Sequence, residues 1–258
     1  MKGTRSDMEY SPNLDTTTIQ GRKKAITFSY DDGVTQDIRL ISLLNKYGLK
    51  ATFNLNSELL GLDGSLIREG VKVSHTKVKP EDIRHIYAGH EIAAHTLTHP
   101  LLPQIEEDSE IIRQVEEDRQ NLSRLAGYEV AGMAYPGGGV NYNRRVAELI
   151  AGRTHIQYAR TTVCSHNFTP QRDLYQFRPT VYHIMDGDRL FEDGKRFLEL
   201  DNNEFSVMYI WGHSYEFDIH NTWNQFEEFL RLIAGKKDIF YGTNREILLS
   251  DAYKAAAV

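Results

Sequence analysis

Short apolar, β-branched and aromatic runs alternate with amphipathic segments along most of the chain. The runs that predict strands lie at residues 25–30, 51–55, 90–95, 133–135, 157–162, 177–183 and 207–211. The amphipathic segments that predict helices lie between or after them, at residues 36–47, 80–87, 103–125, 142–151, 189–200 and 222–233. Strands that alternate with helices in this way predict parallel strands joined by helical crossovers.

The longest predicted helix, at residues 103–125, shows the clearest periodicity. One face carries its apolar residues, which are Ile105, Ile112, Val115, Leu122 and Leu125. Gly127 follows, and glycine commonly ends a helix. The acidic run at residues 106–108 then belongs to the first turn, where the helix dipole favours a solvated acidic face over a ligand cluster.

Domain organisation follows from the same pattern. Residues 6–20 are polar and lack apolar periodicity, so we expect residues 1–23 to form an N-terminal arm. No repeat, linker or low-complexity tract divides residues 24–258, which we expect to form one domain. About seven strands with helical crossovers are compatible with an open doubly wound sheet and with a closed barrel. In both architectures, polar and glycine-rich residues that follow the strands mark the functional edge.

Charge and cysteine content narrow the possible partners. The formal net charge of −6 lacks the basic surface that phosphate backbones require, so we expect no nucleic-acid partner. The single cysteine, Cys164, excludes a disulfide framework and a cysteine-rich zinc site, which leaves histidines and carboxylates to bind any metal. The chain as given has neither a signal peptide nor an apolar stretch of membrane-spanning length, so we expect a cytoplasmic protein without membrane insertion.

Two adjacent carboxylates, Asp31 and Asp32, follow the first predicted strand and precede Gly33. Adjacent residues of a strand point to opposite faces, so both side chains reach one site only where the strand ends and the chain turns. One carboxylate could then coordinate a cation while the other accepts a proton from water. The alternative is an ordinary Asp-Asp-Gly turn with solvated side chains.

Two histidines, His95 and His99, follow another predicted strand with a separation of four residues. This spacing lets two imidazoles converge on one ion, and neutral imidazole is a common zinc ligand. Ten histidines in 258 residues give about 0.4 such pairs by chance, so two unrelated loop histidines are an alternative. Together with an aspartate, the pair would form an Asp-His-His set with open coordination positions, as catalytic metal sites have.

Two further groups follow predicted strands. Residues 137–139, all glycine, would let backbone N–H groups approach a ligand closely, although such a sequence is more often only a turn. His213 ends an apolar run and is either a site residue or a buried core histidine. The aromatic residues Tyr135, Trp211 and Tyr215 either stack on a sugar or belong to the core.

In their order along the chain, these four groups resemble the motifs of the polysaccharide deacetylases with a NodB-type homology domain, which form carbohydrate esterase family four. Residues 29–33 (Ser-Tyr-Asp-Asp-Gly) match a Thr-Phe-Asp-Asp-Gly motif, and residues 95–99 match His-Ser/Thr-x-x-His. Residues 134–137 approximate an Arg-x-Pro-Tyr loop, and residues 211–213 approximate a Leu-x-His strand end. The resemblance covers most of the chain, from about residue 24 to the helix predicted at residues 222–233.

The resemblance implies a fold and an activity. The fold is a distorted (β/α) barrel with about seven parallel strands in a single domain. The activity is removal of an N-acetyl or other N-acyl group from an amino sugar or polysaccharide, so the expected partner is an N-acylated sugar. The implied cofactor is one divalent ion, zinc or else cobalt, nickel or manganese, bound by Asp32, His95 and His99.

The resemblance also implies roles for individual residues. Asp31 would be the general base and His213 the general acid. The backbone N–H of Gly137 would polarise the acyl oxygen, and Tyr135 and Trp211 would line the substrate site.

The chain departs from the family pattern at two places. Ala134 stands where the family has an arginine that pairs with the general base. The family's Asp-x-x-Asp-Trp segment has no clear counterpart, since residues 186–188 (Asp-Gly-Asp) lack the tryptophan. We predict that Arg160 has taken over the pairing with Asp31, because alternation along the strand expected at residues 157–162 can aim it into the barrel mouth. The alternative is a surface arginine.

These departures keep two other functions open. The same site could hydrolyse another amide, such as a formyl or ureido group on a molecule that is not a sugar. Alternatively, the chain could bind metal and carbohydrate without catalysis, which the missing arginine favours. The presence of Asp31 and His213 counts against this second alternative, because a binding protein needs neither.

Overall fold

The structure, a computed structural model, describes residues 18–184, 188–201 and 203–257. Residues 1–17 of the predicted N-terminal arm therefore lie outside the described residues, and so do residues 186 and 187 of the Asp-Gly-Asp segment. Just before the first strand, Ile19 and Arg22 exchange two backbone hydrogen bonds of 3.0 Å and close a turn.

The centre of the fold is a sheet of parallel strands. Its hydrogen-bonded path runs in the order β7-β6-β5-β2-β1-β9-β8. The bounds are β1 (Lys24–Asp31), β2 (Ala51–Leu55), β5 (Glu91–Ala94), β6 (Gly132–Ala134), β7 (Tyr158–Arg160), β8 (Val181–Tyr182) and β9 (Ser206–Gly212). An eighth strand, β10 (Ile239–Tyr241), pairs with the beginning of β1. The seven strands of the path curl into a half-barrel within a single α/β domain, which confirms the predicted fold class.

One chain segment spans the two edges of this path. Phe177 pairs with Arg160 of β7, whereas Thr180 donates its backbone N–H to Tyr209 of β9 over 2.9 Å. Only β8 then continues along β9. The strand predicted at residues 177–183 is therefore correct only near its end, because its beginning crosses from one edge to the other.

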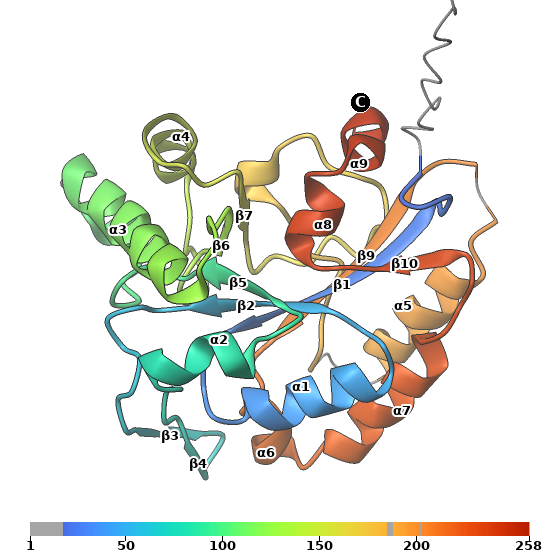
Figure 1. Cartoon of the computed structure of the whole chain (residues 1–258), viewed down its shortest axis with the longest axis horizontal. Coiled ribbons are helices and arrows are strands. Elements are labelled where there is room, and N and C mark those ends of the chain that lie inside the picture. Colours follow the sequence, from blue (N-terminus) through green and yellow to red (C-terminus); the bar gives the residue numbers. More distant parts are fainter. Residues whose placement is uncertain (1–17, 185–187, 202, 258) are drawn as a thin grey trace, which may run out of the picture.

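Helices lie around the outside of the curled sheet (Figure 1). The predicted helices correspond to α1 (Asp37–Lys46), α2 (Ile83–Ile86), α3 (Asp108–Ala126), α4 (Arg144–Arg153), α5 (Arg189–Leu198) and α7 (Trp223–Ile233). Three further helices are too short for periodicity to predict: α6 (Glu216–His220), α8 (Asn244–Leu248) and α9 (Asp251–Ala256). Within the described ranges, no helix is long and apolar enough to cross a membrane.

The longest helix, α3, differs from its prediction at its start and on its buried face. It begins at Asp108, because the chain before it forms a separate 3-10 turn at Leu102–Gln104. Ile111 is fully buried, whereas Ile112 is only partly buried. Gly127 ends the helix as predicted, with a left-handed φ of 83°.

Alternation along β1 determines which of its side chains reach the site. All eight residues of the strand are buried. Ile26, Phe28 and Tyr30 belong to the core that the helices cover. Ala25 packs in a second core cluster on the opposite face. Asp31 shares the alternation of Ala25 and therefore points into the interior of the half-barrel.

A two-stranded antiparallel hairpin stands beside the main sheet. It consists of β3 (Ser65–Arg68) and β4 (Val71–Ser74). Glu69 and Gly70 form its turn with φ angles of 53° and 79°, the left-handed pair that tight hairpins favour. Val73 packs in a small cluster with Val34 after β1 and Tyr215 after β9. The hairpin is thereby fixed against the carboxyl ends of two central strands, and the sequence analysis did not predict it.

Candidate active site

Residues at or after the carboxyl ends of β1, β5, β6 and β9 meet in one cleft of about 360 Å³. The predicted site residues that line it are Asp31, Asp32, His95, His99, Gly137, Trp211 and His213. Arg68, Thr162 and Tyr182 also line it and were not predicted. Residues far apart in sequence thus meet at the edge where parallel α/β folds place their sites.

Asp32, His95 and His99 lie close enough together to hold one ion. One potential ligand atom of each residue lies within 4.8 Å of those of the other two. His99 Nε2 is 3.7 Å from Asp32 Oδ1. Burial lowers the pKa of His95 to about 4, and it also lowers the pKa of His99, so both imidazoles are neutral as metal ligands must be. One carboxylate and two neutral imidazoles fit a divalent ion of the zinc type.

The backbone around this set adopts left-handed conformations. The φ angles of Asp32, Thr96 and His99 are 82°, 69° and 63°. Such angles are uncommon outside glycine and least favourable for β-branched threonine. The Thr96 hydroxyl offsets part of the strain, because it accepts a hydrogen bond of 3.1 Å from the His99 N–H. Strained backbone of this kind is concentrated at functional sites.

Buried hydrogen bonds fix the orientation of His95. Its Nδ1 lies 2.9 Å from the carbonyl oxygen of Ala134. A carbonyl can only accept, so Nδ1 carries the proton and Nε2 keeps its lone pair for a metal. The His95 backbone N–H donates to Asp118 of α3 over 2.9 Å, and Asn56 donates to the Thr96 carbonyl over 2.9 Å. The loop after β5 is therefore held from two sides.

Asp32 has two basic neighbours from the segment after β4. Lys77 Nζ donates to the Asp32 carbonyl over 2.7 Å and lies 3.6 Å from Oδ1. His75 Nε2 lies 3.3 Å from Oδ2. Burial raises the pKa of Asp32, but the His75 hydrogen bond and the Lys77 charge outweigh it and hold the pKa well below its usual range. Sequence reasoning missed both neighbours, because the segment that carries them has no recognisable motif.

Asp31 forms a buried ion pair with Arg160. Arg160 is 0% exposed, and its guanidinium donates to both carboxylate oxygens of Asp31. Asn54 donates a further hydrogen bond of 2.8 Å to Asp31. The guanidinium also lies 4.5 Å from the centroid of the Trp211 ring. Arg160 of β7 is in register with Ala134 of β6. Ala134 is the position at which the resembled family has arginine, so in this chain the positive charge comes from the neighbouring strand.

His213 lies between two carboxylates. Its Nε2 is 4.0 Å from Asp31 Oδ2, and its Nδ1 is 3.1 Å from Glu216 Oε2. Burial lowers the pKa of His213, but the negative charge of Glu216 outweighs it and raises the pKa to about 9. His213 therefore carries a proton at neutral pH.

Glu216, the first residue of α6, is a buried carboxylate beside His213 that the sequence analysis missed. Its carboxylate accepts a hydrogen bond of 2.7 Å from Arg68 and lies 2.9 Å from His183 Nε2, and the Tyr182 hydroxyl also donates to it. Burial raises its pKa, yet the charge of His213 and the other contacts hold the pKa well below its usual range. The available signal was a carboxylate three residues after His213, at the first turn of a short helix.

The three aromatic candidates lie in different environments. Tyr215 lines the cleft and is 2% exposed. Trp211 lines the cleft, although it is only 6% exposed, and it stacks on Tyr182 with ring centroids 4.5 Å apart. Tyr135 is fully buried, its ring stacks on Tyr142, and its hydroxyl donates to the Tyr175 carbonyl. Contrary to the prediction, the Tyr135 side chain does not line the cleft, because it belongs to the core under the helices.

Gly137 lies where only glycine fits. Its φ is 80°, and a Cβ there would lie 2.4 Å from Leu101 Cδ2. Asn141 fixes this loop by donating to the carbonyls of Tyr135 and Gly137 over 3.1 and 3.0 Å. The Gly137 N–H makes no hydrogen bond within the described part of the chain, so it is a free donor at the edge of the cleft.

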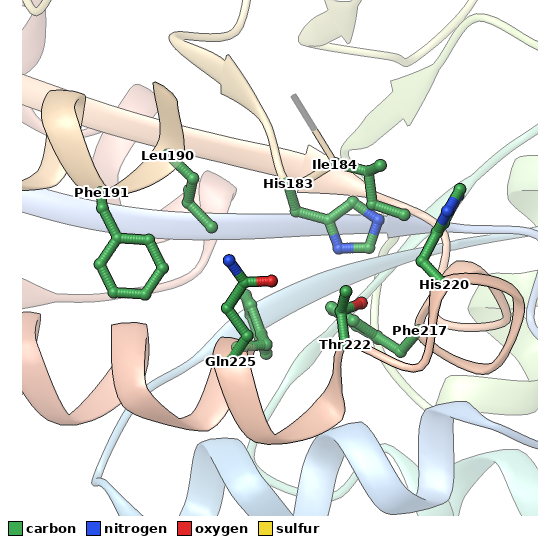
Figure 2. Close-up of a pocket in the computed structure, with 9 residues that line it drawn as sticks. His183, Ile184, Leu190, Phe191, Phe217, His220, Thr222 and Gln225 are labelled. Carbon is green, nitrogen blue, oxygen red and sulfur yellow. The ribbon is translucent and has the colours of Figure 1, made fainter. Parts of the chain in front are cut away.

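A second cavity borders His183. Figure 2 shows several of the side chains that line it, among them His183, Leu190, Phe191, Phe217 and Gln225. It measures about 170 Å³, and none of its lining residues is a carboxylate. It therefore lacks the combination of carboxylates and histidines that the first cleft has.

The sequence model of the polysaccharide deacetylase family matches residues 18–157. A Mycobacterium smegmatis protein assigned to the polysaccharide deacetylases has a similar structure, with a TM-score of 0.61 and 16% identity over 92% of this chain and 91% of that one. A family 4 carbohydrate esterase from Streptomyces lividans has a TM-score of 0.51 and 14% identity over 86% and 93%.

A third similar structure is described as a pseudoenzyme of the same esterase family. It is BA3943 from Bacillus anthracis, with a TM-score of 0.52 and 15% identity over 88% of this chain and 66% of that one. No curated protein sequence matches the chain. At these identities, the similar structures show the fold alone.

We predict that the purified protein binds one divalent ion per chain and that His99→Ala weakens this binding at least about 100-fold, because one of three ligands is lost. Elemental analysis after dialysis against the metal measures the stoichiometry. His155→Ala is the matched control, since His155 is 79% exposed and lies outside the cleft. A stoichiometry of His99→Ala equal to that of the parent protein would refute the ligand set.

Proposed function

Because the chain belongs to the polysaccharide deacetylase family, we propose that it is a metal-dependent hydrolase that removes an N-acetyl or other N-acyl group from an amino sugar or polysaccharide. One observation carries the proposal: a metal-ligand set, a carboxylate and a protonated imidazole meet in one cleft. A site that only bound metal and sugar would need the first of these groups and not the other two.

Asp32, His95 and His99 would hold the ion, since they offer one carboxylate and two neutral imidazoles within reach of each other. When bound, zinc, or else cobalt, nickel or manganese, supplies a Lewis acid for the attacking water and the acyl oxygen. The residues around this set orient the substrate and move the protons.

Asp31 is the residue placed to accept a proton from the attacking water. It is the sequence neighbour of Asp32 and lines the same cleft. Arg160 and Asn54 hold its carboxylate in one orientation. The guanidinium also compensates a charge that would be costly to bury alone. Arg160 does not line the cleft, so in this proposal it is a positioning residue that acts through Asp31.

His213 is the residue placed to donate a proton to the departing nitrogen. An amine is a poor leaving group until it is protonated, so the acid must hold its proton at neutral pH. The Glu216 carboxylate meets this requirement by raising the pKa of His213 to about 9 against the effect of burial. Glu216 is therefore a positioning residue that acts through His213.

Two other groups contact the substrate in this proposal. The free N–H of Gly137 donates to the acyl oxygen as negative charge develops on it. Trp211 forms part of the cleft wall that a sugar ring would contact.

A substrate panel tests the function. Metal-loaded protein is incubated with N-acetylated sugars in free, nucleotide-linked and polymeric form, and with formyl and ureido compounds that are not sugars. The released acid or ammonia is measured beside metal-stripped protein. Metal-dependent acetate release from a sugar supports the proposal, and release from formyl or ureido compounds alone identifies the other amide as substrate. Release from none of them favours noncatalytic binding, the alternative that Ala134 suggests.

We predict that Asp31→Asn lowers turnover by about 10²–10⁴ and leaves the metal content unchanged, because it removes a positioned base but no ligand. Initial rates and elemental analysis on the same sample measure both quantities. Asp63→Asn is a control at an exposed aspartate outside the cleft. Loss of metal in Asp31→Asn would make Asp31 a ligand, and parent-like turnover would exclude it as the base.

The pH dependence tests the acid. If protonated His213 is required, activity declines as the pH rises through the pKa of His213, about 9. Glu216→Gln removes the charge that raises this pKa but not the burial that lowers it. We therefore predict that the alkaline limb of the kcat profile moves to lower pH by roughly one to three units. The exposed Glu228→Gln should leave it in place. An unmoved limb in Glu216→Gln would show that Glu216 does not set the protonation of the acid.

A further inference from the structure

Arg68, the last residue of β3, brings a charge from the hairpin into the cleft. The hairpin is fixed at its base, where the backbone N–H groups of Val78 and Thr35 donate to the carbonyls of Gly33 and Thr76 over 2.9 Å each. Arg68 lines the cleft together with the metal-ligand set, Asp31 and His213. The fold of the hairpin therefore determines where Arg68 lies.

One end of the Arg68 guanidinium is anchored and the rest is available. Nη1 donates to Glu216 over 2.7 Å and to the Tyr215 hydroxyl over 3.3 Å. Nε and Nη2 make no hydrogen bond to any part of the chain that the structure describes. The side chain is 47% exposed, in contrast to Glu216, which is 3% exposed. The anchor thus holds a partly solvated pair of donors at the cleft.

The charges of the cleft are not balanced. Three carboxylates line it or form an ion pair with a residue that does: Asp31, Asp32 and Glu216. A fourth carboxylate, Asp118, accepts hydrogen bonds from the backbone N–H groups of His95 and Ser57. Each of the three ion-paired carboxylates has a cation beside it: Arg160 lies beside Asp31, Lys77 beside Asp32, and His213 beside Glu216. Arg68 is a fourth cation, so the ion-paired groups of the cleft include one more positive than negative charge, even without any charge on His75 or a bound metal ion. This excess is local, because the whole chain has a net charge of −6.

We propose that Arg68 recognises an anionic substituent, a carboxylate or a phosphate group, on the N-acylated sugar. The inference rests on the proposed function and specifies its substrate class. A guanidinium offers two parallel N–H donors that match the oxygens of either group. Arg68 is thus a specificity-determining residue that binds part of the substrate away from the acyl group.

A purely structural role for Arg68 makes a different prediction. If Arg68 only supported Glu216, its loss would weaken the acid and lower turnover equally for neutral and anionic substrates. Recognition of an anionic group instead changes the ratio between the two substrates and acts mainly on KM. Any effect through Glu216 cancels in that ratio.

The test compares Arg68→Gln with the parent protein on three matched substrates. These are a neutral chito-oligosaccharide, the same oligosaccharide with a C6 hydroxyl oxidised to a carboxylate, and the same oligosaccharide phosphorylated at C6. We expect the parent to prefer at least one anionic substrate. The preference in kcat/KM should fall about tenfold in Arg68→Gln, mainly through KM. Comparison of the two anionic substrates decides whether Arg68 recognises a carboxylate or a phosphate group.

Two controls separate recognition from general electrostatics and from folding. Lys72→Gln removes a positive charge from the exposed strand β4 of the same hairpin and should keep the preference. Arg68→Lys keeps the charge but not the paired donors and should keep only part of the preference. Thermal unfolding of each variant tests whether the fold is retained.

Calorimetric binding of the same three oligosaccharides keeps this inference separate from the proposed function. Acid release without any anionic preference in the parent, or an equal loss for all substrates in Arg68→Gln, would overturn the role of Arg68. Binding with a preference that depends on Arg68, but without acid release, would instead contradict the hydrolase and leave the recognition intact.

Discussion

The buried ion pair between Arg160 and Asp31 is the contact on which the geometry of the site depends. Arg160 comes from β7 at one edge of the sheet, binds Asp31 at the end of the central strand β1, and lies against the ring of Trp211 on β9. One side chain thus connects three strands across the interior of the half-barrel. Loss of one partner of such a pair typically costs about 3–5 kcal/mol, because the other charge is left buried and unpaired. The pair therefore links β7 to β1 and orients the carboxylate at the same time.

The other charges of the site follow the same constraint. Glu216 is as deeply buried as Asp31, and Asp32 is nearly so. A buried carboxylate is tolerated only with a cation or several donors beside it. Lys77 and Arg68 supply these cations from the hairpin and its flanking segment, and His213 supplies another after β9. The hairpin therefore contributes a side chain to the cleft. Its Arg68 donates to Glu216 with one guanidinium nitrogen and also lines the cleft.

The sequence predicts the parts of this site that are local. Residues 29–33 and 95–99 lie at strand ends, where alternation and turn geometry bring their side chains to one edge. A role for Arg160 could be proposed from the sequence, because the strand pattern indicates the direction of its side chain and the arginine of the family motif is replaced by Ala134. Glu216 was missed although it follows His213 by three residues, since its contact with His213 depends on how a five-residue helix folds back, which no periodicity encodes. The sequence likewise could not predict whether the sheet is open or closed, because this depends on a segment that crosses between the two edges.

Turnover of Arg160→Lys tests the central claim most directly. The metal-loaded variant is assayed as acid released from the best N-acylated sugar of the panel, with the metal content measured on the same sample. Lysine keeps the charge that compensates Asp31, so the variant should fold and bind its ion, but it cannot hold both oxygens in a planar fork. The account predicts that turnover falls roughly 10- to 100-fold at unchanged metal content, because the carboxylate is misplaced. Turnover equal to that of the parent protein would contradict it.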